Sequence, residues 1–185
     1  MRILTRACLG LFVAWAVHDA EELVTMSHTS RAVLSRLPRR VPVPADLRAS
    51  GVSQTHVNLA IAIMGAIMAA VAAAGAATGG RSPWFRGALW AFGAHGFTHL
   101  AASVVRCAYT PGVVTAPVVV IPFWLWARRV LRDHGRLEQD AGSIVVAISA
   151  APAMFAVHAL TRAVLGSRSV RQAAAERADG RRRGR

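Results

Sequence analysis

Long apolar runs separated by polar connections make up most of the chain. Five of these runs approach the roughly 20 residues that a helix needs to cross the hydrocarbon core of a bilayer, and they cover residues 7–25, 57–78, 87–105, 111–127 and 141–160. The fourth run is short and contains three prolines. Because a helix satisfies its own backbone hydrogen bonds in lipid, the pattern predicts an all-α, multi-pass transmembrane helical bundle of about five helices.

Composition and charge support this class of protein. Hydrophobic residues make up 54% of the 185 residues and charged ones 17%, which is less charge than a soluble domain usually carries. We expect the bundle to occupy residues 1–166, and residues 167–185 to form a basic, disordered cytoplasmic tail.

The formal net charge is +13, and the chain contains arginine but no lysine. Membrane lipids, with anionic headgroups at the arginine-rich loops and tail, are therefore the expected partners. No nucleic-acid motif accompanies the charge, so nucleic acid is not expected.

The distribution of arginine predicts the orientation. With five crossings, eight arginines fall on the face of the amino terminus and fourteen on the other face, seven of them in the tail. The positive-inside rule then places the amino terminus outside the plasma (inner) membrane and the carboxyl terminus in the cytoplasm. The first 16 residues also resemble a secretory signal peptide that ends in Ala-Trp-Ala. We favour an uncleaved helix because the apolar run continues past the charged residues as "LVTM".

Ionisable residues gather at one depth of the expected membrane. In "VHDAEEL" (17–23), the i, i+3 and i+4 spacing places His18, Glu21 and Glu22 on one helix face, and Asp19 is turned about 100° aside. His95 and His99 share a face in the same way. The residues that the expected helices place between mid-membrane and the inner boundary are His18, Glu21, Glu22, His56, His95, His99 and His158. Such groups normally face the bundle interior and pair with one another or with a metal.

Neutral imidazoles and carboxylates suit zinc, iron or manganese. We therefore take these seven residues as candidate metal ligands, with Glu21 or Glu22 also a candidate catalytic base. Several alternatives stay open. His158 would serve equally as an interhelical hydrogen-bonding group, and His56 as an interfacial residue. The two glutamates would form either a solvated, frayed helix end or ion pairs with Arg106.

The order of these motifs resembles the HXXEE family. The resemblance rests on His18-x-x-Glu21-Glu22, then "HGFTHL", then "RCAYTPGVVTA", within residues 10–125. It implies a small bacterial integral membrane protein with a metal site and no settled activity. Arg106 and Tyr109 are candidate substrate-binding residues, the first for an anionic headgroup. For "YTPG" itself, the Pro-Gly pair also predicts a structural turn.

These observations favour a metal-dependent enzyme, either a hydrolase or an oxygen-dependent oxidoreductase, that acts on a lipid-like substrate. One alternative is a proton or metal-ion carrier, which at this size would require a homo-oligomer because the chain shows no inverted repeat. Another is a non-catalytic membrane scaffold whose polar residues fasten the helices. No nucleotide-binding motif occurs, so no nucleotide cofactor is expected.

Overall fold

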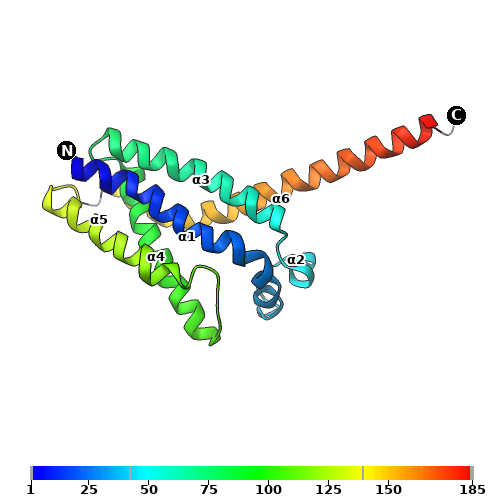
Figure 1. The fold of residues 1–185 in the computed structure, drawn as a ribbon, viewed down its shortest axis with the longest axis horizontal. Helices are drawn as coiled ribbons and strands as arrows, with labels where there is room; N and C mark the ends of the chain where they lie inside the picture. The colour runs from blue at the N-terminus through cyan, green and yellow to red at the C-terminus, as the bar shows by residue number, and fades with distance from the viewer. Residues whose placement is uncertain (1, 42, 139, 184–185) are drawn as a thin grey trace.

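The computed structural model describes residues 2–41, 43–138 and 140–183, and these form helices with no strand (Figure 1). The helices are α1 (Arg2–Ser35), α2 (Ala45–Ser50), α3 (Gln54–Ala77), α4 (Pro83–Arg106), the π-helical turn η1 (Ala116–Val120), α5 (Ile121–Asp133) and α6 (Ala141–Arg183). η1 continues directly into α5, so the two form one continuous helical segment, called the leg of η1 and α5 below. The all-α, multi-helix expectation is confirmed.

Successive long helices run in alternating directions (Figure 1). The leg of η1 and α5 returns alongside α4, and α6 therefore runs in the same sense as α1. Among the described residues, three segments are long and apolar enough to cross a membrane, namely α1, α3 and Ala141–Ser167 of α6. The other two longer helices are less suited to crossing, because α5 has only 13 residues and α4 carries two histidines. The number of crossings, and the boundary between bundle and tail at residue 166, stay predictions.

α1 contacts α2, α3, α4, η1 and α5. Its buried residues recur every three or four positions, which is the period of one helix face; they include Leu4, Ala7, Leu11, Ala14, His18 and Glu22. The buried face of α1 is therefore apolar in its amino-terminal half and carries ionisable residues from His18 onward. α1 also continues ten residues beyond the end expected from hydropathy.

One arginine in the following connection binds the chain at the end of α1. Arg48 of α2 donates hydrogen bonds to the carbonyls of Leu34, Leu37, Pro38 and Val41. The last carbonyls of a helix lack intrahelical partners; the Arg48 guanidinium donates to one of them, that of Leu34, and to three carbonyls just beyond the helix. The connection is therefore anchored against the end of α1.

Two glycines of α4 set the distance between α4 and the leg of η1 and α5. A Cβ atom at Gly93 would lie 2.4 Å from the Trp124 ring, and one at Gly96 would lie 2.8 Å from Cγ1 of Val120. Only a residue without a side chain permits this approach. The candidate ligand His95 lies between the two glycines in sequence, on the helix that this close packing positions.

Candidate metal centre

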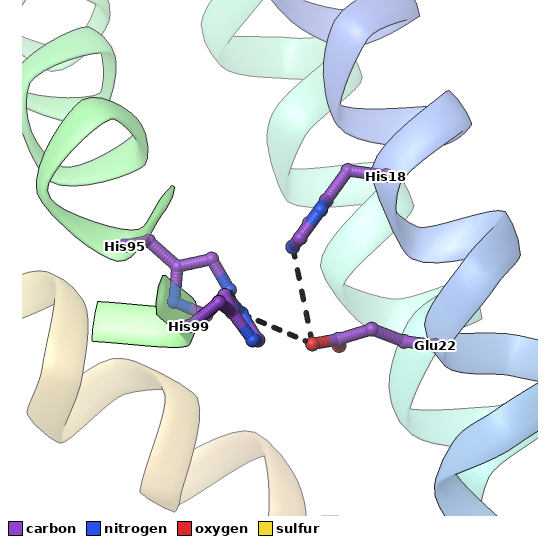
Figure 2. A group of neighbouring side chains, drawn as sticks. All are labelled: His18, Glu22, His95 and His99. Carbon is purple, nitrogen blue, oxygen red and sulfur yellow. Dashed lines mark hydrogen bonds and ion pairs between the residues drawn. The ribbon is translucent and has the colours of Figure 1, made fainter. Parts of the chain in front are cut away.

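Two helices bring four ionisable side chains together inside the bundle. α1 contributes His18 and Glu22, and α4 contributes His95 and His99, each pair one helical turn apart. One potential ligand atom from each residue lies within 4.8 Å of the others. Figure 2 shows the two imidazoles of α4 facing His18 and Glu22 across the space between the helices. The side chain of His18 is fully buried, and Glu22 is 8% exposed.

The spacings within this group are close to those around one metal ion. The Nε2 atoms of His95 and His99 are 2.8 Å apart. Nε2 of His99 lies 3.3 Å from Oε1 of Glu22, and Nε2 of His18 lies 3.9 Å from the same oxygen. Ligands placed about 2.0–2.2 Å from a common ion stand about 3–4 Å from one another. Small side-chain adjustments would therefore suffice for four-ligand binding.

A hydrogen-bond chain orients His18 for this role. The Thr115 hydroxyl donates to Oε2 of Glu21 at 2.6 Å, so its oxygen is left to accept a hydrogen bond from Nδ1 of His18 at 2.8 Å. From this network we assign the proton of His18 to Nδ1 and the lone pair to Nε2. Nε2 is buried and has no hydrogen-bond partner among the described residues. A histidine with one nitrogen held by an outer partner and the other free is the usual arrangement of a metal ligand.

Glu21 lies beside the group rather than in it. Its Oε1 accepts hydrogen bonds from the Tyr109 hydroxyl (2.6 Å) and the Val114 amide (3.2 Å). Its Oε2 accepts from the amide and the hydroxyl of Thr115. Both oxygens are thus occupied by the segment that connects α4 to η1. The adjacent glutamates of the motif have different surroundings, because Glu22 faces the histidines and Glu21 holds this segment.

The segment held by Glu21 closes over the histidines. Gly112 adopts a φ of +81°, and a Cβ atom there would lie 2.6 Å from Cε1 of His18 and 2.8 Å from the His99 ring. The Thr110 hydroxyl donates a hydrogen bond of 3.4 Å to the backbone carbonyl of His99. Partial burial, together with the hydrogen bond to Glu21, raises the pKa of the Tyr109 phenol above its ordinary value. The Pro-Gly turn therefore has the predicted structural role and also contacts two candidate ligands.

The remaining candidate residues lie outside the group. Nε2 of His56 and Nδ1 of His158 are 2.9 Å apart, and their rings stack between α3 and α6. This pairing matches the interhelical alternative for His158. Arg106, the last residue of α4, is partly buried, and its Nε has no hydrogen-bond partner within the described part of the chain.

Sequence reasoning gave no role to two residues of this region. Thr115 is part of the family-like "YTPGVVT" string, but only the fold shows that it links Glu21 to His18. Helical geometry predicts that Asp19 lies off the ionisable face, yet the residue is buried, with 8% exposed. The sequence did contain a signal for Asp19: an acidic residue within an apolar, membrane-length helix normally faces the interior of the bundle.

The fold and the site define a class, that of helical bundles with a buried group of three histidines and one carboxylate between two helices. More particularly, the chain belongs to the family described as "Protein of unknown function with HXXEE motif", whose model matches residues 9–127. The match includes all four residues of the group and the whole segment that covers it. No curated protein and no solved structure matches the chain significantly.

Proposed function

We propose that this protein is an integral membrane metalloprotein in which His18, Glu22, His95 and His99 bind one divalent metal ion. We further propose that it is a metal-dependent enzyme, a hydrolase or an oxygen-dependent oxidoreductase, with a lipid-like substrate. The observation that carries the proposal is the buried Nε2 of His18, whose free lone pair lies beside three other potential ligand atoms.

Free energy favours an occupied group. A buried polar atom without a partner costs about 1–3 kcal/mol, and a carboxylate inside a membrane is costlier still unless it is paired. Binding of a cation would compensate for both at once. Three imidazole nitrogens and one carboxylate oxygen suit zinc, iron or manganese. Such an ion, when bound, supplies Lewis-acid or redox chemistry.

The two glutamates receive separate roles in this proposal. Both oxygens of Glu21 accept hydrogen bonds from residues 109–115, so we assign it the positioning of Thr115 and, through Thr115, of His18. Glu22 is the carboxylate that faces the candidate ligands, and it is the one available for metal binding and proton transfer. Three apolar helices support a location within the plasma membrane, with the amino terminus outside and the carboxyl terminus in the cytoplasm as our proposed orientation.

Elemental analysis of the detergent-purified full chain tests the proposal. We expect about one equivalent of zinc, iron or manganese in the wild type, and its loss in Glu22→Gln. The matched control is Glu138→Gln, which removes the same charge in the connection between α5 and α6 and should keep the metal. Folding of each variant is checked by circular dichroism and thermal unfolding.

The identity of the metal would choose between the two chemistries, since zinc indicates hydrolysis and iron or manganese permits oxidation. A folded wild type without metal, even after incubation with each ion, would overturn the proposal. Ion movement into vesicles with only weak binding would then indicate a carrier, and neither property would indicate a scaffold.

A further inference from the structure

An open groove runs along α1 on the side where η1 and α5 pack. Its volume is about 470 Å³, and most of its lining is apolar, within the range of about 300–1,000 Å³ typical of small-molecule sites. α1 contributes Gly10, Val13 and Val17 to its wall, and the opposite wall includes Val118 and Phe123. The missing side chain at Gly10 leaves room for the Phe123 ring, because a Cβ atom there would lie 2.8 Å from the ring.

The two ends of the groove differ chemically. Arg6 and Trp126 lie at one end, where their helices approach the face of the bundle that holds the amino terminus. Arg6 is exposed and makes no ion pair with any described residue. At the other end, Val17 precedes His18 in sequence, and Val118 lies three residues after Thr115. The groove therefore extends from an exposed cation to the parts of α1 and η1 that adjoin His18 and Thr115 in sequence.

These features fit one occupant, and we infer that the groove binds an acyl chain of an anionic phospholipid, with the headgroup phosphate at Arg6. Between Arg6 and Val17, α1 rises about 16 Å, which is close to half of the roughly 30 Å hydrocarbon core. A guanidinium recognises phosphate, and a tryptophan such as Trp126 favours the headgroup level of a membrane. The inference rests on the membrane location in the proposed function. It deepens that function by placing an acyl chain, not a headgroup, at the end of the groove nearest the metal group.

A photo-crosslinking experiment tests the occupant directly. A small diazirine amino acid replaces Val13 in the groove or, as a control, Val145, an exposed residue of α6. The full chain is reconstituted in nanodiscs of mixed phosphatidylcholine and phosphatidylglycerol, and adducts are identified by mass spectrometry. We expect phosphatidylglycerol adducts to be enriched at position 13 relative to position 145. The enrichment should fall about fivefold in Arg6→Gln, the effect of one arginine near an anionic lipid. Arg81→Gln, which removes an exposed charge between α3 and α4, should leave it unchanged.

Equal lipid selectivity at the two positions, or enrichment that Arg6→Gln does not change, would overturn the inference. Adducts between two copies of the protein at position 13 would also overturn it, because the groove would then be a dimer contact. Metal content is measured in the same samples, which separates the two proposals. Bound metal without selective adducts contradicts only the groove, whereas selective adducts without metal contradict only the metal centre.

Discussion

Replacement of Thr115 by valine tests the chain of hydrogen bonds that orients His18. Valine keeps the shape of threonine but has no hydroxyl, so the change removes the 2.6 Å bond to Glu21 and the 2.8 Å bond to Nδ1 of His18. To bind a metal through Nε2, His18 must then keep its proton on an Nδ1 without a partner. A buried donor without an acceptor costs about 1–3 kcal/mol.

We therefore expect Thr115→Val to weaken metal binding about 10- to 100-fold, which is also the usual effect of losing an outer partner of a metal-binding histidine. The assay is a competition titration of the apoprotein in detergent with zinc and a chromophoric chelator. Thr115→Ser retains the hydroxyl and should bind near the wild-type affinity. Thr98→Val is the matched control, because the Thr98 hydroxyl donates only to the backbone carbonyl of His95.

Unchanged affinity in Thr115→Val would refute the reasoning. Equal losses in Thr115→Ser and Thr115→Val would do the same, because they would show that packing, and not the hydroxyl, matters at this position. A loss in Thr98→Val of the same size would mean that the assay reports general disturbance of the bundle.

Two further predictions concern the segment over the histidines. Tyr109 is the single tyrosine of the chain, so its ionisation can be followed by ultraviolet absorbance. We expect its pKa to lie above the ordinary tyrosine value of about 10. The pKa should fall in Glu21→Gln, because the hydrogen bond to the Glu21 carboxylate favours the protonated phenol. Gly112→Ala should lower the free energy of unfolding by about 1–3 kcal/mol and also weaken metal binding, since the new methyl group would contact the ring of His18.

Each of these predictions has a matched control. Glu138→Gln removes a glutamate away from Tyr109 and should leave the phenol titration unchanged; an identical shift in this variant would contradict the assignment. Gly79 also has a positive φ, of +58°, but nothing lies near a Cβ atom placed there. Gly79→Ala should therefore show the backbone cost without the loss of metal affinity, and loss of affinity in both variants would contradict the contact with His18.

Much of the local structure follows from the sequence. Apolar runs of membrane-crossing length predicted the long helices, and the one-turn spacings of His18 with Glu22 and of His95 with His99 predicted that each pair shares a helix face. The order of the HXXEE, "HGFTHL" and "YTPG" elements indicated the family. These inferences succeed because helical periodicity and helix length depend on residues close together in the chain.

Only the tertiary structure decided which faces meet. Of the seven candidate ligands, four lie together in one group. His56 and His158 form a separate pair, and Glu21 binds the segment after α4. That outcome depends on how each helix is rotated and how closely it approaches its neighbours, as at Gly93 and Gly96. It also depends on Thr115, 97 residues away from His18 in sequence. Packing between distant segments sets these relations, and no local pattern of residues contains them.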